Sequence, residues 1–182
     1  PDELAGLANL TAGLLTEGTK TRSSKQVSEE IDFVGGSIGA SANSDYAAAS
    51  LSILKKDLNL GLDLLSDILM NPAFDEKEIE RERSQTLAGI INQKDDPGAI
   101  ASKAFSKILY LKHPYSRPSE GFEDTLPKIK KEDIINFHRK YYRPNNIIMA
   151  VVGDITLDEA VSLIEKYFGK WEKAKVSLPK IP

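Results

Sequence analysis

The sequence predicts an α+β domain, a two-layer sandwich in which helices pack on one face of a mixed β-sheet. The predicted order of elements is helix, helix, strand, strand, several helices, strand and helix. Helical segments show apolar residues three or four positions apart, which is the spacing of one face of an amphipathic helix. The run from Ile147 to Val152 is instead a continuous apolar stretch of strand length. Helices packed on one face of a mixed sheet fit this order of elements best.

In the first half of the chain, turn and capping residues bound each predicted element. Leucines at helical spacing precede Gly18, Ser23 or Ser24 offers an N-cap, and Gly35-Gly36 is a helix stop because glycine adopts the left-handed conformation most easily. Asp57 can cap the next helix, and Pro72 ends it. The predicted helices cover 4–17, 24–34, 58–69 and 76–93, and the predicted strands cover 37–41 and 46–54.

The second half continues with helices, one strand and a final helix. Asp95-Asp96-Pro97 ends the preceding helix, and a helix over 97–110 leads into a turn at 113–118. The apolar run 147–152 is expected to be a strand buried on both faces. Helices over 131–142 and 158–168 flank it. We interpret 1–175 as one domain and 176–182 as the start of an interdomain linker.

Composition excludes several classes of function. The 182 residues include 24 basic and 27 acidic side chains, a net charge of −3, which disfavours nucleic-acid binding. The sequence contains no apolar run of the roughly 18 residues that a membrane span needs. It has no cysteine and two histidines, His113 and His138, which are 25 residues apart. A helical zinc motif with two imidazoles four residues apart is therefore absent.

Seven local strings occur in an order and spacing that cover nearly the whole chain. Together they resemble the insulinase/pitrilysin family of zinc metallopeptidases, which includes the mitochondrial processing peptidases. The strings are Gly6 to Thr19, Val34 to Ala40, Asp57 to Leu69, Asn71-Pro72, Phe74 to Arg83, His113-Pro114-Tyr115, and Tyr142 to Asn146 leading into Val151 to Asp154.

The resemblance implies a zinc site at four positions, and this chain lacks the required residue at each. The family carries H-x-x-E-H on its first helix and a further glutamate downstream; two histidines and that glutamate bind zinc, and the motif's own glutamate activates a water. Asn9 stands at the first histidine, Ala12 at the general base and Gly13 at the second histidine. Gly89 stands at the third ligand, 76 positions after Gly13.

These replacements remove the chemistry, because a catalytic zinc ion needs three protein ligands and alanine and glycine have no donor atom. We therefore expect a non-catalytic member of the family, with no cofactor in this chain, no activity alone, and zinc only in an active partner. Glycine within a helix costs up to about 1 kcal/mol relative to alanine. We interpret Gly13 and Gly89 as sites where two helices, or a partner chain, approach closely.

The resemblance also implies a peptide site and a partner. Active domains of the family pair a substrate strand with the edge strand that follows Gly-Gly. Here the corresponding residues are Ser37, Ile38, Gly39, Ala40 and Ser41, which could equally form a tight internal strand. The expected partner is a zinc-bearing homologous subunit or a second homologous domain, with a dimer as the assembly. A structural core-type subunit of a larger complex and a free-standing peptide-binding module are the alternatives.

Three further expectations concern single residues and the chain start. We expect His113 to anchor a loop, His138 to be solvated, and Glu82 to be a relic of the zinc surroundings, two helical turns before Gly89. Family domains have a strand or hairpin before the first helix, so the resemblance implies that this chain begins inside the domain. Bacterial relatives occur in the cytoplasm and the periplasm, and the sequence favours neither.

Overall fold

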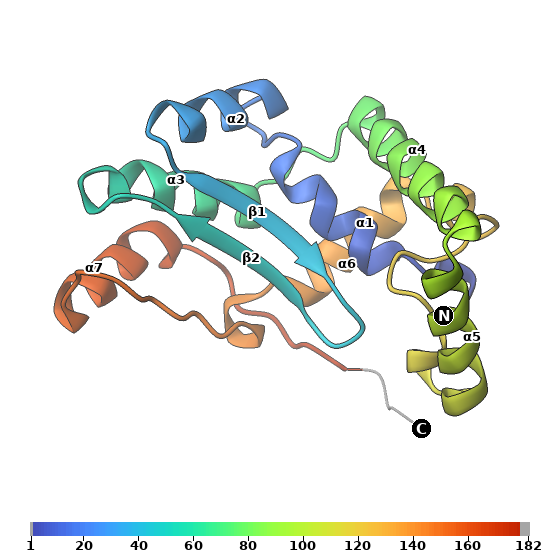
Figure 1. Ribbon diagram of the computed structural model, residues 1–182. Helices are drawn as coiled ribbons and strands as arrows, with labels where there is room; N and C mark the ends of the chain where they lie inside the picture. Colours follow the sequence, from blue (N-terminus) through green and yellow to red (C-terminus); the bar gives the residue numbers. More distant parts are fainter. Residues whose placement is uncertain (1, 179–182) are drawn as a thin grey trace.

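A two-stranded hairpin crosses the molecule, with helices behind it and at both ends (Figure 1). The computed structural model describes residues 2–178. Strands β1 (Ser37–Ala42) and β2 (Ala47–Ser52) pair antiparallel, from Ser37 opposite Ser52 to Ala42 opposite Ala47. Helix α1 (Leu7–Gly13) packs against β1 and α3 (Leu58–Met70) against β2, while α7 (Leu157–Phe168) packs on α3. The α+β class with a layer of helices against the sheet is confirmed.

Helices form close to where the sequence predicts them, because their capping residues are present. Ser23 and Gln26 form a reciprocal capping box, and so do Thr156 and Glu159. The Asp96 side chain accepts bonds from two backbone N–H groups at the start of its helix. The described helices are α1 (Leu7–Gly13), α2 (Ser24–Phe33), α3 (Leu58–Met70), α4 (Glu76–Asn92), α5 (Pro97–Tyr110), α6 (Lys131–Tyr141) and α7 (Leu157–Phe168).

One core holds α1 in place from several sides. Leu10 and Leu14 are almost fully buried, with side chains from α3, α4 and α6 completing the cluster. Truncating one such leucine to alanine typically costs about 2–5 kcal/mol, because the cavity collapses only partly. The helix that carries three of the four vacated catalytic positions is therefore rigidly placed. The other central members of the core are Leu15, Leu64, Ile68, Ile79, Leu126, Ile129 and Ile134.

The expectation of a doubly buried strand at 147–152 is wrong. This segment is extended but joins no ladder among residues 2–178, so the described sheet contains only β1 and β2. Ile148 is 98% exposed and Val152 is 97% exposed. An apolar β-branched run favours an extended backbone, but a ladder also needs a neighbouring strand, and the described part of the chain supplies none beside this run.

The structure describes only part of the predicted C-terminal linker. Residues 176–178 are extended, and the remainder of the predicted linker, 179–182, lies outside the described part of the chain. Across residues 2–178, no helix combines the length and apolarity that crossing a bilayer requires.

Candidate functional site

The four positions that the resemblance assigns to the zinc site lie on two helices that pack against each other. Asn9, Ala12 and Gly13 come from α1, and Gly89 comes from the last turn of α4. Ala12 is fully buried, Asn9 and Gly13 are half-buried, and Gly89 is exposed. Residues 80 positions apart in the sequence thus belong to one pair of neighbouring helices, although neither helix supplies a histidine or cysteine at these positions.

Asn9 makes a structural bond to the sheet. Its side-chain Nδ2 donates to the carbonyl oxygen of Ala42, the last residue of β1, over 3.3 Å. The residue at the position of the first histidine therefore ties α1 to the edge of β1.

Gly13 leaves room for a carboxylate from α4. A Cβ atom built at Gly13 would lie 2.7 Å from Oε1 of Glu82, closer than real Cβ contacts come. Burial raises the pKa of the Glu82 carboxyl above its ordinary value; the negative charge of Glu17 raises it further, and Arg81 opposes the shift. The close approach expected at Gly13 therefore exists, and a side chain makes it.

Gly89 differs, because a Cβ atom there would meet nothing within 4 Å. Glycine at this position is not required by packing within the described chain. The expectation that a second helix of this chain closes on Gly89 is wrong.

The residues around these positions do not fit zinc. The Asn9 amide is bonded to Ala42, Ala12 and Gly13 have no donor, and Glu82 supplies a single carboxylate. Among residues 2–178, no three histidine, cysteine, aspartate or glutamate side chains are grouped to hold a metal ion. Three ligands are needed for a catalytic zinc, so this donor set does not support one.

The edge of β1 beside α1 is open for pairing. Asn43 N–H bonds Tyr46 O at the hairpin end, and Ala42 O turns outward to Asn9. Because hydrogen-bonded and non-hydrogen-bonded pairs alternate along an antiparallel ladder, the backbone groups of Ala40 and Ile38 also turn outward. These two residues therefore offer unpaired N–H and C=O groups along this edge.

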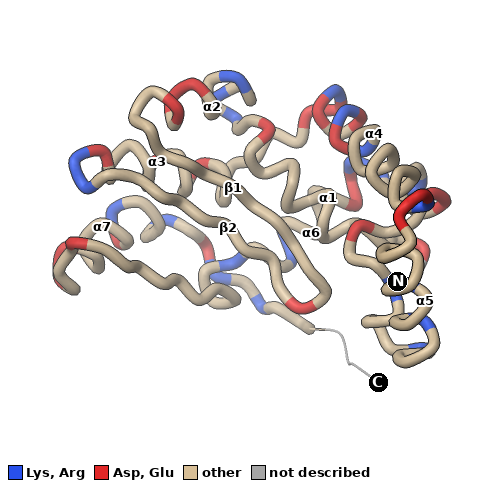
Figure 2. Tube along the Cα trace, in the orientation of Figure 1, with Lys and Arg blue, Asp and Glu red and all other residues tan. Residues whose placement is uncertain are grey.

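Side chains along β1 are small on the solvent side and apolar on the other. Ile38 and Ala40 pack against the core, whereas Ser37 and Ser41 are exposed and Gly39 is half-buried. Both strands are free of charged side chains, as Figure 2 shows. The five sequence-predicted residues thus lie together on one strand of the described sheet, and their role in peptide binding stays a prediction.

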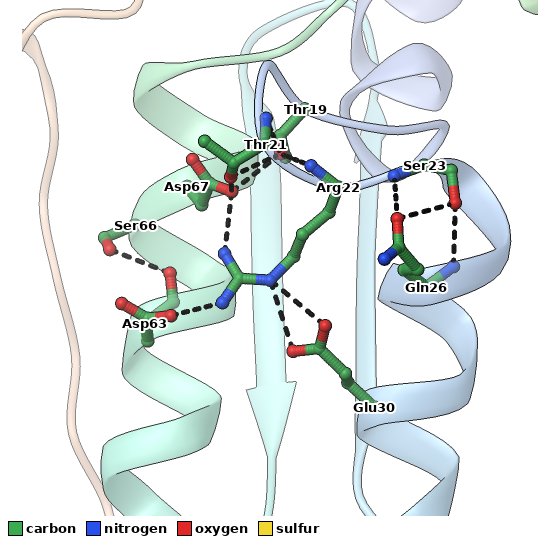
Figure 3. A network of polar contacts seen from close by, with 9 residues as sticks. All are labelled: Thr19, Thr21, Arg22, Ser23, Gln26, Glu30, Asp63, Ser66 and Asp67. Carbon is green, nitrogen blue, oxygen red and sulfur yellow. Dashed lines mark hydrogen bonds and ion pairs between the residues drawn. The ribbon is translucent and has the colours of Figure 1, made fainter.

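A polar network fixes the turn that follows α1 (Figure 3). Arg22 reaches Asp67 over 2.8 Å and Asp63 over 2.5 Å on α3, and Glu30 on α2 over 3.2 Å. Thr19 and Thr21 donate to the same Asp67 oxygen over 2.6 and 2.9 Å.

The network shifts the ionisation of its members. Burial raises the pKa of Asp67, but the hydrogen bonds from Thr19, Thr21, Asn71 and Arg22 outweigh it, so the net shift is downward. Arg22 is likewise desolvated, yet its bonds to the carboxylates raise its pKa. The sequence reasoning missed this network, because its members lie 41 to 48 residues apart and share no motif.

The two histidines have structural environments. The ring Nδ1 of His113 accepts a bond from Tyr115 N–H over 3.2 Å, which anchors the turn as expected. The expectation for His138 is wrong: it is 8% exposed, its Nε2 lies 2.9 Å from Leu69 O, and its ring stacks on Tyr142. Burial lowers the pKa of His138, so the neutral ring is favoured.

Comparison with protein families agrees with this geometry. Residues 1–121 match the model described as insulinase (peptidase family M16), and residues 128–182 match the peptidase M16 inactive domain. The chain belongs to the insulinase family. The assignment of Asn9, Ala12 and Gly13 to the H-x-x-E-H positions of this family stays a prediction, and all three residues lie on α1.

Relatives and solved structures cover almost all of the chain. A zinc protease of Mycobacterium leprae, ML0855, is 30% identical over 166 residues, and the Bacillus subtilis zinc protease YmxG is 28% identical over 170 residues. The peptidase M16 inactive domain from Pseudomonas fluorescens superposes with a TM-score of 0.90 at 30% identity, over 98% of this chain. A protease from Helicobacter pylori gives 0.90 at 25% identity, over 99% of this chain.

This insulinase-family chain spans less than half the length of the relatives that it matches. It covers 41% of the Bacillus protein, 37% of the Mycobacterium protein and 44% of the Pseudomonas chain. The Helicobacter chain is matched over 45% of its length. More than half of each of these relatives therefore lies outside the part that matches this chain.

Proposed function

We propose that this chain is a non-catalytic insulinase-family domain that pairs with an active, zinc-bearing homologue and forms part of the chamber that holds the peptide. The observation that carries the proposal is the outer edge of β1, held beside α1, where three of the four positions assigned to the zinc site lack a ligand or a general base. Such a site suits binding, because it offers backbone hydrogen bonds without a metal or a general base. Zinc and hydrolysis then come from the partner.

Strand addition is the binding mode that this edge supports. The outward N–H and C=O groups of Ile38 and Ala40 would pair with an extended peptide, and the small side chains of Ser37, Gly39 and Ser41 leave the backbone accessible. Because main-chain bonds carry the affinity, the site would accept peptides of varied sequence. Asn9 lies at the margin of this edge, where its amide bonds the carbonyl oxygen of Ala42.

Copurification from the organism that encodes the chain tests the pairing. We expect a homologue with an intact H-x-x-E-H motif to accompany this chain, and peptide hydrolysis to require that homologue. Copurification with membrane redox subunits would instead assign a structural core-type role. Calorimetric binding of peptides in the absence of any family partner would assign a free-standing binding module.

A pair of proline substitutions tests the strand edge. Ala40→Pro removes an outward N–H that the β1–β2 ladder does not use, so the fold should persist while affinity for unstructured fluorescent peptides falls about fivefold or more. Gly39→Pro removes an N–H directed at β2 and should instead lower the stability of the chain. Undiminished peptide binding by a folded Ala40→Pro variant would show that peptides do not pair with this edge.

A further inference from the structure

Helix α5 turns its polar face toward the protein and its apolar face toward solvent. No residue of α5 is buried. The half-buried positions, Ala99, Lys103 and Ser106, recur at helical spacing and face the body of the molecule, where Lys103 pairs with Glu120 over 3.6 Å. An amphipathic helix of a protein that lacks a partner normally does the reverse.

The outward face is strongly apolar. Phe105 is 64% exposed, Ile108 is 75% exposed and Leu109 is 54% exposed, with Ala101 and Ala104 exposed between them. Leu111, just after the helix, is 72% exposed and has a φ of 49°, a conformation that strains a non-glycine residue. A contiguous apolar face of this kind marks an interaction surface, whereas isolated exposed leucines do not.

Between Asp96 and Glu120, the segment that carries this face has charges of one sign. Residues 97–119 contain four of the 24 basic residues and none of the 27 acidic ones, so the rest of the chain carries all of the negative charge. The tube in Figure 2 shows the same contrast between α5 and the mixed charges of α4. Two copies that met through α5 around a two-fold axis would bring lysines together, which disfavours a second copy as the occupant.

The position of α5 connects it to the vacated site. The helix follows α4 after one short turn, and α4 carries Gly89, the exposed third-ligand position with open space around it. Figure 1 places α5 at one end of the molecule, and α7 lies at the other. A domain seated on α5 would therefore border the vacated catalytic positions.

The relatives supply a candidate occupant. The Pseudomonas and Helicobacter chains match 98% and 99% of this chain, a range that includes α5, and more than half of each chain lies outside the match. In proteins of this fold, further domain structure is thus available to cover this face. An apolar patch bordered by carboxylates would complement both the aliphatic face and its lysines.

We propose that the outward face of α5, formed by Ala101, Ala104, Phe105, Ile108, Leu109 and Leu111, is the docking surface for the homologous domain of the proposed function. This inference rests on that function and specifies where the partner sits. The partner meets the α5 face with an apolar patch whose rim is acidic.

Site-specific crosslinking in the organism that encodes the chain tests the α5 face. Phe105 is replaced by the photoreactive p-benzoylphenylalanine, and the adduct is identified by mass spectrometry. The expected adduct is an insulinase-family homologue, with the same probe at Leu157 on α7, 78% exposed, as the control that gives none. An adduct with a second copy of this chain, a lipid or an unrelated protein overturns the proposal, as does no adduct at Phe105 when a homologue copurifies.

Charge substitutions provide a second measurement. The double variant Phe105→Asp/Ile108→Asp should lower the copurified homologue about tenfold or more, because it places charges at the centre of the interface. Leu157→Asp is equally exposed and should change nothing. If the wild-type chain brings down a homologue and the α5 variant does so equally, the docking surface is wrong and the proposed function stands. If the wild-type chain brings down none, the proposed function itself fails.

Discussion

Separate substitution of Gly13 and Gly89 tests whether another side chain occupies the space beside each glycine. Gly13 and Gly89 both have a helical backbone, so alanine would favour each helix by up to about 1 kcal/mol. Their surroundings differ, since a Cβ atom meets nothing at Gly89 but lies 2.7 Å from Oε1 of Glu82 at Gly13.

The expected magnitudes follow from that difference. Gly89→Ala should stabilise the chain by about 1 kcal/mol. Gly13→Ala must push the half-buried Glu82 side chain from its position, at a cost of about 0.5–1.5 kcal/mol, so its net effect should be close to zero. In a Glu82→Ala background the obstacle is gone, and Gly13→Ala should then gain about 1 kcal/mol.

Urea denaturation of the four proteins in this cycle, with Gly89→Ala as the control, measures the coupling between Gly13 and Glu82. We expect a coupling of about 1 kcal/mol. Equal effects of Gly13→Ala in the two backgrounds would refute the position of Glu82 over α1 and the account of how the vacated histidine position is filled.

Three further results are expected. Arg22→Ala should lower the free energy of unfolding by about 2 kcal/mol, because it leaves partly buried carboxylates without their partner. Lys25→Ala removes an exposed ion pair and should change the free energy of unfolding by less than about 0.5 kcal/mol. Equal effects of the two substitutions in urea denaturation would contradict the network. Glu82→Gln should stabilise the chain at pH 7, because the raised pKa of Glu82 means that its charged form is disfavoured in the folded state; this gain should disappear below the ordinary pKa of 4.5, and a gain independent of pH would contradict the assignment. A triple variant that restores the three ligands, Asn9→His/Gly13→His/Gly89→Glu, should bind one zinc ion. Metal analysis of this variant beside the unchanged chain measures the binding. A folded variant without zinc would show that the positions are misassigned.

Local signals in the sequence were sufficient to predict most of the helices and the two strands of the hairpin. Helix starts at Ser24 and Pro97 follow from caps that bond their own neighbouring backbone, so no distant residue is needed to predict them. The four positions of the zinc site come from the family resemblance, and their assignment stays a prediction. Their membership of two packed helices follows from the family fold.

The pattern of residue types along the sequence does not predict contacts between distant residues. The apolar run 147–152 gives no sign of whether a neighbouring strand exists, and that neighbour decides whether the run joins a sheet. His138 lies in a charged stretch of α6, yet Phe74 and Tyr142 enclose its ring. Glu82 was singled out by its spacing from Gly89, but its contact with Gly13 depends on how α1 and α4 pack.

Zinc content and peptide hydrolysis of the purified chain test the central claim most directly. Metal analysis is combined with an assay on unstructured fluorescent peptides, first with the chain alone and then with its copurified homologue. We predict no stoichiometric zinc and no hydrolysis by the chain alone, and both once the homologue is present. Stoichiometric zinc together with peptide hydrolysis by this chain alone would contradict the account.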